Sequence, residues 1–328
     1  MHASLLLITL FAFAVWQAGA AKHALDSIAT IQLPKVAGRI DHLAFDQATR
    51  RLFVAALGND TIEVIDTANN AHLRSLPGFH EPQGIAVVPD LKAVAIANGD
   101  SGTLQLLDAE TFQTRWTVNV GTDADNVRYD ARNKQLYVAA VGGLAIVDPA
   151  SGKIAQKLAI AGHPESFQLE RDGPRVFANL PGLLSSEVVV GNRQTVAVNG
   201  RWSTGSCRAN YPMALDEATR RLFIGCRRPA MLAMIDTATG KSVASTSIVG
   251  DTDDLFYDSL RRRLYVIGGE GFVDVIERAG DMLRSSGRVR TRAGARTGLW
   301  VADENRLYVA VPARAAEPAE VRVFGPKN

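Results

Sequence analysis

One pattern occurs seven times along the chain, and this repeat constrains the fold more than any other feature of the sequence. In each copy an Asp ends a short apolar run, a polar turn follows, and a second apolar run begins, such as RRLFVA after Asp46 or KQLYVA after Asp130. Successive copies are 40 to 45 residues apart, which is the usual length of one four-stranded propeller blade. The residues that mark the copies are Asp46, Asp90, Asp130, Asp172, Asp216, Asp258 and Asp303.

The apolar runs within each copy are typical of β-strands. They are too short for amphipathic helices, and they are rich in β-branched and aromatic residues. In the first copy they cover residues 42–45, 52–57 and 61–65, and six of the seven copies continue into a fourth run, such as residues 154–160. The seventh copy lacks a fourth run, whereas an additional strand, residues 27–33, precedes the first copy.

We therefore predict an all-β fold, a seven-bladed β-propeller of four-stranded antiparallel blades. The N-terminal strand is expected to complete the last blade. Such a closure joins the two ends of the chain and removes open sheet edges that would otherwise favour aggregation.

The second and third runs resemble a known repeat. LFVAALGNDTIEVID and LYVAAVGGLAIVD are similar to the YVTN-type (WD-repeat-like) repeat of seven-bladed β-propellers in secreted bacterial proteins. The resemblance covers essentially the whole mature chain and implies the same fold. It implies no single function, because similar propellers include binding proteins, lyases, lactonase-like enzymes and electron-transfer domains.

The N-terminus is typical of an export signal. Residues 5–16 form an apolar run that is too short to span a bilayer, and Ala18-Gly19-Ala20 follows as a small-residue cleavage site. The segment departs from the usual pattern because His2, rather than Lys or Arg, precedes the apolar run. We expect residues 1–20 to be a signal peptide and residues 21–328 to form one domain. The mature protein is then expected to be a periplasmic or secreted monomer without a transmembrane segment.

The charge balance argues against a nucleic-acid or membrane partner. The formal net charge is +2, with 36 Lys and Arg residues and 34 Asp and Glu residues, so no overall field attracts polyanions. The C-terminal quarter is rich in Arg, but aromatic residues for base stacking do not alternate with these arginines.

Two cysteines, Cys207 and Cys226, fall at the same end of one predicted hairpin. In an oxidising compartment an even number of cysteines favours a disulfide. The sequence does not decide whether this disulfide forms, because it does not give the distance between the two Cα atoms.

The loops divide into two sets, and only one set varies enough to carry specificity. Turns such as DQATRR, DEATRR and DTATGK recur from blade to blade, so their Asp residues are expected to stabilise turns. We call the end of the ring formed by these turns the far face. The loops that enter the first strands, and those between second and third strands, differ in every blade and form the near face. We expect binding at the near face.

Four carboxylates are predicted to meet at the near-face mouth of the ring. Like charges that converge must be balanced by arginines, protons, a cationic ligand or a metal ion. Two interpretations stay open: the carboxylates cap backbone amides and pair with Arg, or they hold one divalent cation (Ca, Mg or Zn). The aligned positions are Asp41, Gln83, Asp125, Glu165, Tyr211, Asp253 and Thr297, of which Asp41, Asp125, Glu165 and Asp253 are the candidate metal ligands.

Two functions follow from this face. The favoured one is an exported scaffold that binds an unidentified protein, peptide or small-molecule ligand; the alternative is a metal-dependent lactonase-like or lyase-like enzyme. The alternative is implied by similar propellers, in which carboxylate, Asn and His side chains hold a divalent cation. His42 or His163 would then transfer a proton, and Arg208 or Arg296 would orient an anionic substrate. Single-stranded nucleic-acid binding is a weaker third option. The candidate ligand-binding residues are Gln83, Arg208, Asn210, Tyr211, Arg227, Arg228 and Arg296.

Overall fold

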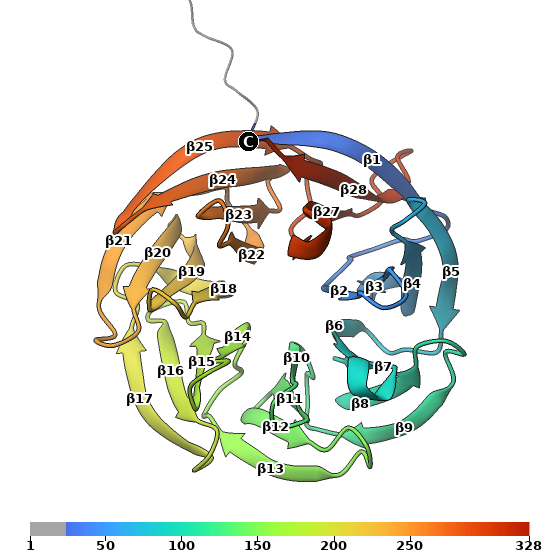
Figure 1. Cartoon of the computed structure of the whole chain (residues 1–328), viewed down its shortest axis with the longest axis horizontal. Coiled ribbons are helices and arrows are strands. Elements are labelled where there is room, and N and C mark those ends of the chain that lie inside the picture. Colours follow the sequence, from blue (N-terminus) through green and yellow to red (C-terminus); the bar gives the residue numbers. More distant parts are fainter. Residues whose placement is uncertain (1–23, 328) are drawn as a thin grey trace, which may run out of the picture.

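The computed structural model describes residues 24–327, which form seven four-stranded antiparallel sheets arranged as blades around a central axis (Figure 1). The prediction of a seven-bladed, all-β propeller is confirmed. The predicted signal peptide, residues 1–20, lies outside the described residues. Within residues 24–327, no helix has the length and apolar character needed to cross a membrane.

Each blade is built from strands that are consecutive in the chain, except the last. Blades one to three are β2 (Leu43–Asp46), β3 (Arg51–Ala56), β4 (Thr61–Asp66) and β5 (Ala71–Pro77); β6 (Pro82–Val88), β7 (Ala93–Asn98), β8 (Thr103–Asp108) and β9 (Thr114–Asn119); and β10 (Val127–Asp130), β11 (Gln135–Ala140), β12 (Gly143–Val147) and β13 (Ile154–Ala159). Blades four and five are β14 (Phe167–Leu169), β15 (Arg175–Leu180), β16 (Glu187–Asn192) and β17 (Ala197–Ser203), and β18 (Arg208–Asp216), β19 (Arg221–Arg228), β20 (Ala230–Asp236) and β21 (Ser242–Ser247). Blades six and seven are β22 (Thr252–Asp258), β23 (Arg263–Gly268), β24 (Phe272–Ala279) and β25 (Met282–Arg290), and β26 (Gly298–Val301), β27 (Arg306–Val311), β28 (Ala319–Pro326) and β1 (Leu25–Leu33).

The N-terminal strand closes the ring, as predicted. β1 pairs antiparallel with β28, from Leu25 opposite Pro326 to Leu33 opposite Ala319, and it forms the outer edge of blade seven beside β28 (Figure 1). Ile31 and Leu33 are buried in the core between blades seven and one. Closure therefore buries apolar side chains as well as pairing an edge.

The aromatic residue of the repeated motif is a core residue. It lies on the second strand of a blade, where neighbouring strands cover both edges and adjacent blades cover both faces. In six blades this position holds one of the fully buried rings Phe53, Tyr137, Phe177, Phe223, Tyr265 and Tyr308. Since burial of one such side chain contributes roughly 1.5–3 kcal/mol, the motif stabilises the contacts between blades.

The far-face turns have the predicted structure. The side chain of Asp46 accepts a hydrogen bond from the backbone N–H of Ala48 at 3.1 Å, and Asp130 accepts one from Arg132 at the same distance. In blades two and seven, short 3-10 helices take the place of this turn: η2 (Pro89–Leu91) and η3 (Ala302–Glu304). A third 3-10 helix, η1 (Leu57–Asn59), lies on the near face of blade one.

The two cysteines form a disulfide. Cys207 and Cys226 have their Cα atoms 5.4 Å apart, within the range that a disulfide allows, and both side chains are buried. The bond joins the near-face ends of β18 and β19, so it fixes the start of the innermost strand of blade five. The question that the sequence left open is thus resolved in favour of the bridge.

Candidate functional site

A polar cavity of about 380 Å³ lies at the near-face mouth of the ring, and we call it the near-end cavity. Residues from all seven blades line it. They bring together many of the residues that the sequence singled out for this face: Gln83, Asp125, His163, Glu165, Tyr211, Arg227, Asp253 and Arg296.

The repeat places these residues at one height because it fixes the backbone pairing of each blade. The N–H of Asp41 donates to the carbonyl of Ala55 at 2.7 Å, and that of Asp125 donates to Ala139 at 2.9 Å. The N–H of Glu165 makes the same bond, to Asn179, at 3.0 Å. Counting residues along the repeat therefore identified equivalent positions in these three blades. It was wrong by one residue for Thr297, whose carbonyl accepts from the N–H of Ala310 as the carbonyl of His42 accepts from Ala55.

Gly84 lets the backbone of blade two pack closely against the backbone of blade three beside Asp125. A Cβ atom on Gly84 would lie 2.2 Å from the carbonyl oxygen of Asp125, closer than any side chain can sit. The backbone that carries Asp125 is thus packed directly against its neighbour, which fixes the position of the carboxylate.

Two of the four carboxylates are paired with arginines. Arg39 lies 2.7 Å from Asp41, and Arg227 lies 2.6 Å from Asp253. Arg227 also stacks on the ring of Tyr211, with its guanidinium carbon 3.9 Å from the ring centre. Burial raises the pKa of Asp253 to about 7 even though Arg227 opposes the shift.

The other two carboxylates, Asp125 and Glu165, lie within hydrogen-bonding reach of each other. Burial raises the pKa of Asp125 well above its ordinary value, and the charge of Glu165 adds to the shift. Burial likewise raises the pKa of Glu165 to about 7, although its hydrogen bond to Asp125 opposes the shift. Among the residues that the structure describes, Oδ1 of Asp125 is buried without a hydrogen-bond partner. Near neutral pH the pair therefore shares a proton, and within residues 24–327 no arginine lies within ion-pair distance to balance its remaining charge.

His163 lies beside this pair. Its Nδ1 atom is 3.6 Å from Glu165 and 3.5 Å from Asp123, while its buried Nε2 atom has no hydrogen-bond partner within residues 24–327. His163 thus turns its Nδ1 atom toward Glu165 and Asp123 and leaves its Nε2 atom without a partner among the described residues.

His42 lies deeper along the axis and contacts carboxylates on both sides. Its Nδ1 atom is 3.3 Å from Asp254, and its Nε2 atom is 3.6 Å from Asp41 and 3.9 Å from Asp125. Burial opposes the positive charge, but Asp254 and Asp41 outweigh burial and raise the pKa of His42 to about 10. A protonated imidazole cannot accept a further proton, so near neutral pH His42 balances charge rather than acting as a base.

The predicted metal ligands do not converge as a cation site requires. Within residues 24–327, no group of three or more His, Cys, Asp or Glu side chains is arranged to hold a metal ion. Asp41 and Asp253 face arginines instead, and Asp125 faces Glu165. Of the two interpretations left open by the sequence, pairing with arginine describes the geometry of Asp41 and Asp253.

Three further candidates lie outside the near-end cavity. Asn210 is fully buried and donates hydrogen bonds to Asn179 and to the carbonyl of Glu187, at 3.0 and 2.9 Å, which join blades four and five. Arg208 and Arg228 are opposite each other on β18 and β19, and both are exposed.

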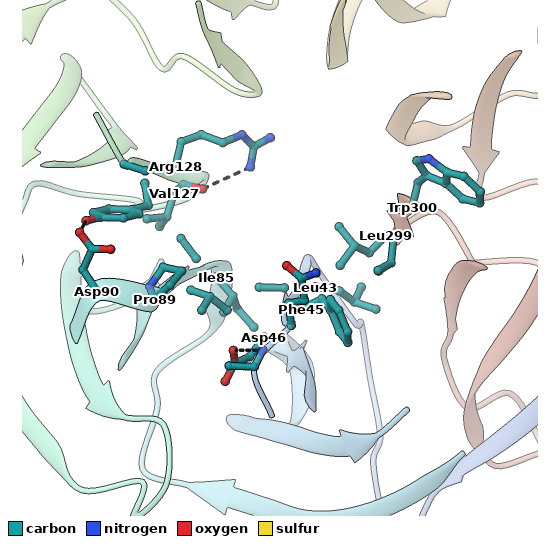
Figure 2. Close-up of a pocket in the computed structure, with 18 residues that line it drawn as sticks. Leu43, Phe45, Asp46, Ile85, Pro89, Asp90, Val127, Arg128, Leu299 and Trp300 are labelled. Carbon is teal, nitrogen blue, oxygen red and sulfur yellow. Dashed lines mark hydrogen bonds between the residues drawn. The ribbon is translucent and has the colours of Figure 1, made fainter. Parts of the chain in front are cut away.

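A second cavity, which the sequence analysis did not identify, occupies the other end of the ring. It measures about 690 Å³ and is lined mainly by apolar side chains of the innermost strands of blades one, two, three and seven, as Figure 2 shows. We call it the far-end cavity. The uniform far-face turns suggested a purely structural end, and the only signal in the sequence was the set of large apolar residues on the first strands, such as Leu43, Phe45, Ile85 and Leu299.

The comparisons with known proteins agree with this architecture. The model of the YNCE-like β-propeller family matches residues 11–220. A chain in the crystal structure of the mitotic checkpoint complex is similar in fold, with a TM-score of 0.77, 12% identity and 100% coverage of both chains. Hydrazine synthase from Kuenenia stuttgartiensis is also similar, with a TM-score of 0.72 and 15% identity over 84% of this chain and 95% of the other. At these identities the two structures show a shared fold alone. No curated protein sequence matches the chain.

Proposed function

The chain belongs to the YNCE-like β-propeller family, and we propose that it serves as an exported binding scaffold. In this proposal the near-end cavity receives a basic side chain of a peptide or protein partner. Export rests on the N-terminal apolar run and its small-residue cleavage site. The binding function rests on the charges of the cavity and on the side chains at its rim.

The main support for this proposal comes from the Asp125–Glu165 pair. Both residues line the near-end cavity, and none of the arginines within residues 24–327 lies within ion-pair distance of either carboxylate. A buried carboxylate oxygen without a partner costs about 1–3 kcal/mol or more. An ammonium or guanidinium group placed in the cavity would supply both the missing hydrogen bond and the missing charge.

The remaining charges of the near-end cavity favour the same ligand. Of the described residues that line it, five are carboxylates and three are arginines. The arginines already pair with carboxylates, as Arg39 does with Asp41 and Arg296 does with Asp251 at 3.2 Å. The carboxyls without an arginine partner lie on the side of blades two to four, and a cation bound there would favour their ionised form over the protonated one.

Apolar side chains beside the acidic pair favour a peptide or protein over a simple amine. Leu183 and Leu184, in the near-face loop of blade four, are 67% and 90% exposed. Val141, in the corresponding loop of blade three, is 46% exposed. Asp125 and Glu165 belong to these same two blades. A partner could thus place a basic residue in the cavity and cover the apolar side chains with its own apolar residues.

Two probes test the proposal. The first is N-acetyl-arginine amide, with N-acetyl-citrulline amide as a neutral control of nearly equal shape; binding is measured by isothermal titration calorimetry. We expect only the arginine compound to bind, and we expect Asp125→Asn together with Glu165→Gln to weaken its binding at least about tenfold. Glu110→Gln, which removes a carboxylate from the far face, is the matched control and should leave binding unchanged.

The second probe is a fluorescein-labelled Leu-Leu-Arg-Leu-Leu peptide. Leu184→Ser should weaken the binding of this peptide without changing the binding of N-acetyl-arginine amide. Equal binding of the arginine and citrulline compounds would refute the proposal. Elemental analysis of the purified protein tests the enzyme alternative. One equivalent of a bound divalent metal that is lost in Asp125→Asn would support a metal-dependent enzyme instead of a scaffold.

A further inference from the structure

The far-end cavity has the size and lining of a binding site for a small amphiphilic molecule. Its volume of about 690 Å³ falls within the range of about 300–1,000 Å³ that ligand sites occupy. Leu43, Phe45, Ile85 and Leu299 line it from blades one, two and seven (Figure 2). Trp300 also lines the cavity, although its ring packs on Tyr265, with the two ring centres 4.9 Å apart. These side chains would contact a hydrocarbon chain or an aromatic ring.

One cation reaches into this apolar cavity. Arg128, on β10, extends its guanidinium group away from the strand, as Figure 2 shows, and donates one hydrogen bond to the carbonyl of Val127 at 3.2 Å. The guanidinium carbon lies 5.7 Å from the ring centre of Phe167. In the part of the chain that the structure describes, no carboxylate lies within ion-pair distance of Arg128.

The carboxylate that acts most strongly on the charge of Arg128 is already engaged. Asp254 exerts a coulombic effect on Arg128, but its oxygens accept a hydrogen bond from the N–H of Gly298 at 2.9 Å and lie 3.3 Å from His42. Arg128 thus keeps most of its five N–H donors for another acceptor. A cation in apolar surroundings is stable only when an anion or other acceptors compensate for its lost hydration.

We infer that the far-end cavity binds an amphiphilic carboxylate, with the carboxylate on Arg128 and the apolar part against Leu43, Ile85, Leu299 and Trp300. The fork of the guanidinium group suits two parallel hydrogen bonds to one carboxylate. This ligand differs from the partner proposed for the near face, because it binds through the guanidinium group of Arg128 and not through carboxyl groups. The two proposals are therefore independent.

Decanoate and decanol are the probes, because they share one hydrocarbon chain and differ in the charged group. Binding to the full mature protein is measured by isothermal titration calorimetry. We expect decanoate to bind at least about tenfold more tightly than decanol, since the hydrogen bonds to Arg128 are charge-assisted. Arg128→Gln should remove this preference, and Arg128→Lys should keep part of it.

Arg132→Gln is the matched control. Arg132 lies on the same blade and the same face, but its side chain is 60% exposed and pairs with Asp172 at 3.1 Å. This variant should bind decanoate like the wild type. Leu299→Trp, which adds bulk to the cavity wall, should weaken both probes. Melting temperatures show whether each variant is folded.

The inference fails if decanoate and decanol bind equally, if neither binds, or if folded Arg128→Gln keeps the preference for decanoate. Loss of the preference in both Arg128→Gln and Arg132→Gln would also overturn it, because a general charge effect would then explain the result.

Discussion

Raising the pH should destabilise the protein through the loss of one proton from His42. The folded state holds this proton because Asp254, Asp41 and Asp125 surround the ring, which raises the pKa of His42 from 6.5 to about 10. Between these two values the folded state binds more protons than the unfolded state. The stabilisation is thus complete below about pH 6.5 and disappears as the pH rises to about 10.

The expected magnitude is large for one side chain. A pKa that rises from 6.5 to about 10 corresponds to a loss of about 5 kcal/mol, at about 1.4 kcal/mol per pKa unit. Glu165 and Asp253 act in the same direction at lower pH. Their pKa values are raised to about 7, so the stability they contribute declines as the pH rises from about 4 to 7. The net slope of stability against pH should be negative over this whole range.

Urea unfolding, followed by tryptophan fluorescence at several pH values between about 6.5 and 10, measures the effect. His42→Gln should flatten the slope over this interval, because Gln has no proton to lose. His80→Gln, which changes an exposed near-face histidine, should keep the wild-type slope. If the free energy of unfolding of the wild type is constant from about pH 7 to 10, or falls equally in His42→Gln, the charge assigned to His42 is wrong.

Three other perturbations have defined outcomes. Replacing both Cys207 and Cys226 by Ala should lower the free energy of unfolding by about 3 kcal/mol, because the disulfide closes a loop of 19 residues. Urea unfolding under oxidising conditions measures this loss. An unchanged unfolding midpoint would contradict the prediction. Arg227→Gln removes the partner of Asp253 at 2.6 Å and should cost about 1.5–3 kcal/mol, because Arg39 and Arg296 remain 3.9 Å from this carboxyl. Arg228 is exposed, and Arg228→Gln should change stability by less than about 0.5 kcal/mol. Equal effects of the two substitutions in urea unfolding would show that the ion pair is unimportant. Deleting residues 24–33 exposes the edge of β28 and removes buried Ile31 and Leu33, so size-exclusion chromatography should detect aggregates instead of a monodisperse protein.

The architecture of this protein could be predicted from its repeat. The spacing of the repeated Asp residues set the number of blades, and the missing fourth run of the last copy, with the extra run at residues 27–33, identified the closing strand. Both are consequences of local chemistry, since alternating apolar residues and Asp turns specify strands and hairpins over a few residues. The same regularity placed Asp41, Asp125 and Glu165 at equivalent backbone positions.

The pairing of the charges and the position of the apolar cavity depend instead on contacts between blades. Arg227 of blade five reaches Asp253 of blade six, and His42 of blade one contacts Asp254 of blade six, across 212 residues of sequence. Long side chains from different blades make these contacts, and a repeat that specifies each blade separately contains no information about them. The far-end cavity is likewise a property of the closed ring, because its walls come from the first strands of four blades. Only ring closure brings Arg128 and Trp300 to the same cavity.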